Sequence, residues 1–193
     1  MKSNHTFKIL LFFGLLFFLG ASYAQISQGS IRFGPDISYS NSKLKIDGIS
    51  AKFKQSNLNA GITGGYYVID NLEIGVSLGL LSNKSKVESY EEKQSGFTFG
   101  PHVAYMVPIS DNLYLPILGG FGYNSLTIDT DYDELTFGGI SFGVGTGLEY
   151  LIDHKIGARM SLGSDFGTLK DNDSEAEIDV NAFQFGVGVS FYF

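Results

Sequence analysis

The sequence predicts an all-β fold, an eight-stranded antiparallel up-and-down transmembrane β-barrel preceded by a cleavable signal peptide. Three observations carry this prediction. Apolar residues alternate with small or polar residues over runs of about 9–11 residues, the length of a tilted strand that crosses a bilayer. The second face of these runs is rich in glycine, and aromatic residues recur near the ends of the runs.

The composition suits a chain made of strands. The 193 residues are enough for one domain, and they include 25 glycines, 11 tyrosines and 17 phenylalanines. Charged residues make up 17%, below the usual ~25%. There is no cysteine, which excludes a disulfide framework and a thiolate metal site. The net charge of −7, without a basic stripe, argues against nucleic-acid binding.

The first element is expected to be a signal peptide over residues 1–24, followed by a barrel domain over residues 25–193. Lys2 and Lys8 make a basic start, residues 9–19 form an apolar core, and small residues precede the expected cleavage site. The alternative is a transmembrane anchor. A helix over the apolar core is only ~17 Å long, against a hydrocarbon thickness of ~30 Å, which favours the signal peptide.

Tight turns and longer polar segments are expected to alternate along the chain. Asp70-Asn71, Asp111-Asn112 and Asp153-His154 are turn dipeptides between alternating runs, and each predicts a tight β-hairpin. The longer polar segments, which we expect to be loops, span residues 40–56, 83–95, 124–135 and 166–180.

The expected strands lie between these turns and loops. They span residues 28–39, 57–68, 72–82, 96–108, 113–123, 136–150, 155–165 and 181–193. In the third strand one face carries Leu72, Ile74, Val76, Leu78 and Leu80, and the other carries Glu73, Gly75, Ser77 and Gly79. Such period-two alternation is typical of a strand between two different environments.

Two kinds of barrel share this pattern. A soluble, lipocalin-like barrel has its apolar face inside, whereas an outer-membrane barrel has it toward lipid. The second face of a soluble barrel would meet water and carry many charged side chains. Here glycine dominates that face, and an eight-stranded lumen has little room for larger residues. The sequence therefore favours apolar residues outside.

Aromatic residues mark the strand ends. Tyr66, Tyr105 and Tyr150 lie on the apolar face shortly before the tight turns, as in an aromatic girdle at a membrane interface. Because lipid contains no water to satisfy a strand edge, the last strand is expected to pair with the first. The short turns would then face the periplasm and the long loops the outside of the cell.

The final stretch, FQFGVGVSFYF over residues 183–193, alternates apolar residues with small or polar ones and ends on Phe193. With the signal peptide and four hairpins, it makes residues 25–193 resemble the small eight-stranded outer-membrane barrels of the OmpA/OmpX type, also called outer membrane protein β-barrel domains or porin-family small barrels. The resemblance implies the outer membrane of a Gram-negative cell. It also implies that the barrel assembly machinery reads Tyr192 and Phe193 as an assembly signal.

A few charged residues fall on the glycine-rich face. They are Arg32, Asp36, Glu73, Glu149 and Arg159. Because a lone buried charge is costly, we expect an internal ionic network that fills the lumen, with an ion path as the alternative. We expect Tyr150 opposite Ile156 in the last tight hairpin. That register sets Glu149 opposite Gly157, with Arg159 as its diagonal neighbour.

No enzyme or cofactor site is expected. After the signal peptide only His102 and His154 remain, and no Ser/Asp constellation is evident near His102. Some small outer-membrane barrels are lipid A deacylases or palmitoyl transferases, so catalysis is the alternative here. No cofactor is implied by any motif.

The loops differ in charge. Residues 40–56 carry four lysines against one aspartate, whereas residues 124–135 and 166–180 each carry a net charge of −4. DTDYDE, over residues 129–134, is similar to a calcium loop, but it lacks the glycine at the sixth position and has Ile140 at the twelfth. Solvated surface is the favoured interpretation, with weak divalent-cation binding left open.

These observations predict a structural or surface-interaction role, carried by four extracellular loops around a filled lumen. The alternatives are a narrow ion or small-solute channel and a secreted lipocalin-like binder. The expected partners are outer-membrane lipid and lipopolysaccharide, the barrel assembly machinery and a ligand of the loops outside the cell. The basic first loop is expected to contact lipopolysaccharide phosphates. A monomer is the expected oligomeric state.

Overall fold

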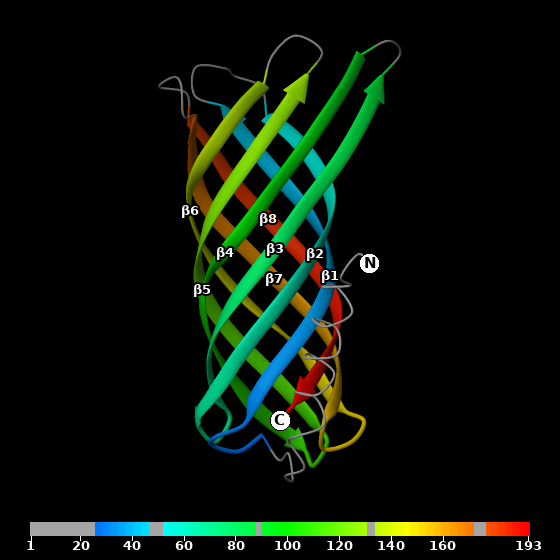
Figure 1. Cartoon of the computed structure of the whole chain (residues 1–193), viewed down its shortest axis with the longest axis vertical. Helices are drawn as coiled ribbons and strands as arrows, with labels where there is room; N and C mark the ends of the chain where they lie inside the picture. Colours follow the sequence, from blue (N-terminus) through cyan, green and yellow to red (C-terminus); the bar gives the residue numbers. More distant parts are fainter. Residues whose placement is uncertain (1–25, 47–51, 88–89, 131–133, 172–176) are drawn as a thin grey trace, which may run out of the picture.

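The computed structural model describes residues 26–46, 52–87, 90–130, 134–171 and 177–193. In these residues eight strands form a closed barrel (Figure 1). The strands are β1 (Ile31–Ile46), β2 (Lys52–Ile69), β3 (Leu72–Val87), β4 (Tyr90–Ser110), β5 (Leu113–Thr130), β6 (Glu134–Leu151), β7 (Ile156–Asp171) and β8 (Glu177–Tyr192). The predicted all-β, up-and-down fold is confirmed.

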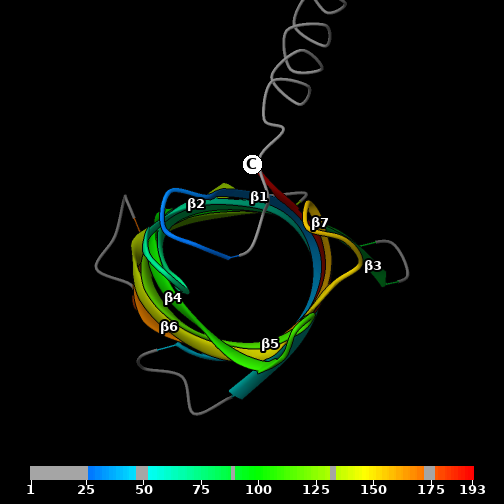
Figure 2. The same cartoon turned by 90° about the horizontal axis from the view of Figure 1, so that it is seen from below.

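Each strand pairs antiparallel with its neighbours in sequence, and β8 pairs with β1 to close the ring (Figure 2). At the closing seam the backbone N–H of Ile31 donates to the carbonyl of Phe193, and the N–H of Phe193 donates back to Ile31, each at 2.9 Å. The expected pairing of the last strand with the first is confirmed. It leaves β8 without an open edge at this end of the barrel.

The three Asp-containing dipeptides form the tight turns. Asn71 adopts a φ of 64°, a left-handed conformation that asparagine tolerates in turns. In the β6–β7 turn Asp153 Oδ1 accepts hydrogen bonds of 2.7 Å from the backbone N–H groups of Lys155 and Ile156. This carboxylate fixes a turn centred on His154.

The register predicted for the β6–β7 hairpin is wrong by two residues. Tyr150 pairs with Ala158, and Glu149 stands directly opposite Arg159. The reason is the turn itself, in which Ile152 N–H bonds to the carbonyl of Ile156 at 2.9 Å. Glu149 and Arg159, which were expected to be diagonal neighbours, are therefore directly opposite each other on β6 and β7.

The strands are longer than predicted, at 16–21 residues each. Most residues of the expected long loops continue the strands, so that expectation is wrong for them. Polar residues can remain in the strands beyond the apolar belt, because the backbone hydrogen bonds between strands form whether or not the side chains are solvated by water. The remaining connections, residues 47–51, 88–89, 131–133 and 172–176, lie outside the described residues, as does the expected signal peptide.

The outer surface of the barrel is apolar over its middle. Large exposed residues come from all eight strands, among them Ile37, Ile62, Ile74, Phe99, Ile117, Phe142, Met160 and Val187. The side chains of Tyr66, Tyr105 and Tyr150 are about half exposed on this surface, toward the tight-turn end. A lipocalin-like barrel would have the opposite arrangement. Among the described residues, no helix is long and apolar enough to cross a bilayer.

The lumen is closed at the tight-turn end by a floor of buried side chains. Ile26, Tyr67, Met106, Leu151 and Tyr192 pack together there. The segment before β1 crosses this opening, as Figure 2 shows from below. It is held by backbone hydrogen bonds from Gly29 N–H to the Tyr67 carbonyl at 2.9 Å and from Asn71 N–H to the Ile26 carbonyl at 3.3 Å.

Candidate functional site: the charged lumen and the outer strand ends

The first charged cluster of the lumen is built on Glu73. Arg32, 2% exposed, donates from Nε and Nη2 to the two carboxylate oxygens of Glu73 at 2.6 and 2.7 Å. Its Nη1 donates to Thr63 Oγ1 at 3.0 Å. Glu73 itself is fully buried. A bidentate pair of this kind satisfies both charges where water is excluded.

A glycine lets this pair form. Arg32 lies on β1 and Glu73 on β3, so the pair spans the intervening strand β2. Gly65, on β2, is the register partner of Arg32, and a Cβ on it would overlap the side chain of Glu73. The absence of a side chain at this position therefore gives Glu73 its path to Arg32.

The second cluster is built on Glu149, which is also fully buried. Arg159 donates from Nε to Glu149 Oε2, and Tyr192 donates from its hydroxyl to Glu149 Oε1 at 2.9 Å. The ring of Tyr192 packs on that of Tyr67, with centroids 6.3 Å apart. The cluster thus joins the last strand to the apolar floor.

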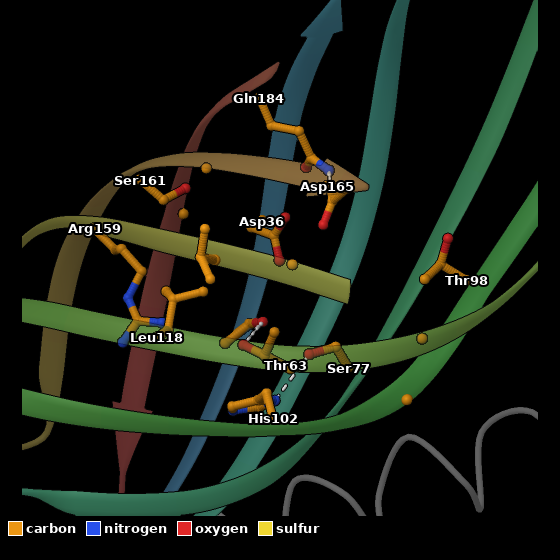
Figure 3. Close-up of a pocket in the computed structure, with 18 of the residues that line it drawn as sticks. Asp36, Thr63, Ser77, Thr98, His102, Leu118, Arg159, Ser161, Asp165 and Gln184 are labelled. Carbon is orange, nitrogen blue, oxygen red and sulfur yellow. Dashed lines mark hydrogen bonds between the residues drawn. The ribbon is translucent and has the colours of Figure 1, made fainter. Parts of the chain in front are cut away.

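Asp36 belongs to neither cluster. It lines a cavity of about 250 Å³ above them, together with Arg159 and a second carboxylate, Asp165 (Figure 3). The side chain of Gln184 donates a hydrogen bond to Asp165. The five predicted lumen charges therefore divide into the pair Arg32–Glu73, the pair Glu149–Arg159, and a separate Asp36.

A second cavity of about 390 Å³ adjoins the first toward the end of the barrel opposite the tight turns, which we call the outer end. The two share polar lining residues such as Ser77, Thr98 and Asp165. Sequence reasoning missed Asp165 and Gln184. Asp165 is an even number of residues from Arg159 along β7, and Gln184 is an even number from Tyr192 along β8. The period-two alternation therefore predicts that both lie on the lumen face.

His102 has partners that the sequence did not reveal. Its Nε2 lies 2.8 Å from Glu73 Oε1, and its Nδ1 lies 2.9 Å from Ser77 Oγ. The expectation that no serine and acid lie near His102 is wrong. Both partners come from β3. Gly75 stands directly opposite His102, and Glu73 and Ser77, two residues to either side of Gly75, are the diagonal neighbours of His102. A strand register brings the three together, and the sequence alone does not give it.

The outer strand ends carry the charge asymmetry of the expected loops. The register sets Lys43 opposite Lys54 and Lys45 opposite Lys52 on β1 and β2. On the adjoining strands β7 and β8, Lys170 Nζ lies 2.5 Å from Glu177 Oε1, and this carboxylate raises the pKa of the lysine. No group of three or more metal-ligating side chains occurs among the residues with described placement. Residues 131–133 of the calcium-like stretch lie outside them.

Comparisons with known proteins agree with this architecture. The family model of the outer membrane protein beta-barrel domain matches residues 10–191. Ail of Yersinia pestis is 15% identical, with 86% of this chain and 99% of that chain covered and a TM-score of 0.56. Neisserial surface protein A is 18% identical, with coverages of 83% and 97% and a TM-score of 0.60.

The N-terminal β-barrel domain of Pseudomonas aeruginosa OprF is 17% identical, with coverages of 86% and 99% and a TM-score of 0.58. These identities are low, so the structural likeness shows the fold alone. No curated protein matches the chain. The family match spans nearly the whole chain, and the apolar outer surface is that of a barrel in lipid. The chain belongs to the outer membrane protein beta-barrel family, and its location is the outer membrane.

Proposed function

We propose that this barrel is a non-conducting scaffold with a structural and surface-interaction role. Its outer strand ends and their four connections meet partners outside the cell. The observation that carries the proposal is the closure of the lumen at the tight-turn end, which the proposal places toward the periplasm. There the apolar floor lies beneath two clusters in which Glu73 and Glu149 are fully buried and ion-paired.

The lipid partner in this proposal is lipopolysaccharide. The register places Lys43 opposite Lys54, with the uncharged Asn181 of β8 on the other side of Lys43, and like charges in neighbouring positions favour a bound anion. Ail has been solved in complex with the heparin analogue sucrose octasulfate, a polyanion. We propose that phosphate groups of lipopolysaccharide bind at the outer strand ends of this barrel. Insertion by the barrel assembly machinery after removal of residues 1–24, and a monomeric state, complete the proposal.

A non-enzymatic role is part of the proposal, although Ser77, His102 and Glu73 are arranged like a hydrolytic triad. Both oxygens of Glu73 already bind Arg32, which weakens this carboxylate as a partner for an imidazolium. The three residues also lie within regular strands, whose backbone N–H groups serve the ladder rather than an oxyanion.

We expect a fluorophosphonate probe to leave Ser77 unlabelled in the folded barrel. Mass spectrometry of the labelled protein measures this, with a known serine hydrolase as the positive control. The matched variant is Ser77→Ala. Labelling of the wild type that disappears in this variant contradicts the non-enzymatic role.

The second candidate function is a narrow channel, favoured by the two adjoining cavities in the lumen. Planar-bilayer recording separates the two functions. We expect no discrete conductance from the wild-type barrel under conditions in which a large porin gives clear steps. A stable conductance that changes when Arg159 is replaced by glutamine would establish the channel instead.

A further inference from the structure

The lumen is hollow between its ion-paired clusters and the outer end of the barrel. The larger of its two cavities, of about 390 Å³, lies toward the outer end, and we call it the upper cavity. All eight strands contribute to its wall, and the apolar floor closes the barrel at the opposite end. Small-molecule sites in proteins have volumes of this order. The upper cavity is therefore large enough for a small ligand that the barrel wall surrounds.

The upper cavity has an excess of negative charge. Of the described residues that line it, only Asp36 and Asp165 carry a charged group. The arginines of the clusters below are each paired with a buried glutamate, Glu73 or Glu149. Those clusters are thus neutral within themselves and do not balance the two aspartates. An enclosed carboxylate that no cation balances favours a positively charged ligand.

Glycines on the neighbouring strands leave both carboxylates uncovered. Asp36 stands between Gly61 of β2 and Gly188 of β8, and a Cβ on Gly61 would lie 3.0 Å from either carboxylate oxygen. Asp165 stands opposite Gly143 of β6, where a Cβ would overlap its carboxylate. Both aspartates line the same space from different strands, β1 and β7 (Figure 3). A molecule in the lumen can therefore reach both of them.

Other polar side chains of the wall are already bonded to one another. Thr98 Oγ1 donates to Asn124 Oδ1 at 2.7 Å, and Asn124 Nδ2 donates to Ser141 Oγ at 2.8 Å. Asn59 Nδ2 donates to Ser40 Oγ at 3.1 Å. A ligand that used these groups would have to replace existing hydrogen bonds. The aspartate carboxylates, with about four acceptor positions each, are therefore the preferred polar contacts for a donor in the cavity.

One side of the upper cavity is apolar at its outer end. The apolar side belongs to a cluster of buried and partly buried residues of β5, β6, β7 and β8, which are Phe137, Leu169, Ile178, Leu126, Ile128 and Val180. Leu126, Leu169 and Val180 also line the cavity. Asp165 precedes Leu169 by four residues on β7, and Ala182, its partner on β8, follows Val180 by two. A carboxylate thus lies next to an apolar surface in one cavity.

We propose that the upper cavity binds a small organic ammonium ion that carries one apolar group. The ammonium donates to the carboxylate of Asp165, and the apolar group lies against Leu126, Leu169 and Val180. Asp36 adds a second negative charge to the same space. The proposal goes beyond the surface-interaction role, because it places a ligand inside the barrel. The closed floor makes the cavity a binding site without making it a path through the membrane.

The test uses the folded mature chain in zwitterionic detergent micelles, with the methyl groups of leucine and valine labelled for NMR. The probe is phenethylammonium. We expect saturable shifts of the methyl signals of Leu126, Leu169 and Val180, which give its Kd. Val76 and Leu148 are exposed on the lipid-facing surface, so their methyl groups report partition of the probe into the micelle. We expect their signals to stay unchanged over the range in which the lumen signals saturate.

Two related molecules separate the contribution of the charge from that of the hydrocarbon. 2-Phenylethanol keeps the aromatic ring and lacks the charge, whereas methylammonium keeps the charge and lacks the ring. Each is expected to bind the wild type at least about tenfold more weakly than phenethylammonium, because each loses one of the two contacts.

Matched aspartate variants locate the ammonium. Asp165→Asn is expected to weaken binding of phenethylammonium at least about tenfold, and Asp36→Asn about threefold, since Asp36 is farther from the apolar side of the cavity. The control is Asp179→Asn, which removes the same charge from the exposed face of β8, where Thr168 Oγ1 donates to Asp179 at 3.0 Å. We expect this control to change the affinity less than about twofold. Heat-shifted electrophoretic mobility verifies that each variant is folded.

Four results overturn the proposal. The first is the absence of saturable shifts at the lumen methyl groups, and the second is equal shifts at Val76 and Leu148, which would mean partition into the micelle alone. The third is binding of 2-phenylethanol as tight as that of phenethylammonium, and the fourth is equally tight binding of methylammonium. These comparisons use the wild type, so they decide the matter even if a variant fails to fold. None of them measures conductance or binding at the outer strand ends, so failure of this inference and failure of the proposed function are distinguishable.

Discussion

Replacing Glu73 with alanine is expected to lower the free energy of unfolding of the barrel by about 3–5 kcal/mol. The change leaves Arg32, 2% exposed, without the two carboxylate oxygens that lie 2.6 and 2.7 Å from its nitrogens. An uncompensated buried charge is among the most costly single defects in a folded protein. Urea unfolding in micelles, followed by the heat-shifted band on gels, measures the loss.

Two controls make this result specific to the ion pair. Asp36→Asn removes a lumen carboxylate that lines the cavity without belonging to either cluster, and a much smaller loss is expected. The double variant Arg32→Leu/Glu73→Leu removes both charges and is expected to recover more than half of the loss. A double variant no more stable than Glu73→Ala would show that the damage comes from packing and not from the unpaired charge.

Deleting Phe193 is expected to reduce the folded protein in the outer membrane severalfold while leaving export unchanged. Phe193 makes two backbone hydrogen bonds with Ile31, which end the β8–β1 closure. By resemblance, a terminal aromatic residue is also what the barrel assembly machinery reads. Fractionation of cells, with heat-shifted mobility as the mark of the folded barrel, measures insertion.

The replacement Phe193→Tyr is the matched control, because it keeps both the backbone pairing and a terminal aromatic ring. We expect it to insert like the wild type. Processing to the mature form is the measure of export for both variants. Normal insertion of the deleted chain would remove the assembly-signal proposal for Tyr192 and Phe193.

The ion pairs show where sequence reasoning reached its limit. The alternation placed Arg32, Asp36, Glu73, Glu149 and Arg159 on one face. Which of these charges meet depends on registers and on space. Arg32 and Glu73 are 41 residues apart in sequence and two strands apart in the barrel, and they meet because Gly65 leaves room between them. No local pattern encodes such a contact.

Strand length was the second feature that the sequence did not predict correctly. The predicted strands end with the apolar residues, since the change to polar composition is the only local signal for the end of a membrane strand. The observed strands continue, because backbone hydrogen bonds hold them in water as well as in lipid.

The sequence by itself determined the eight strands, the face of each that meets lipid, the tight turns and the closure of the last strand on the first. These follow from a period of two and from turn chemistry, which act between residues close in the chain. Only the tertiary structure decided the pairing of the buried charges and the partners of His102. Those depend on the stagger between strands around the closed ring, which no single segment contains.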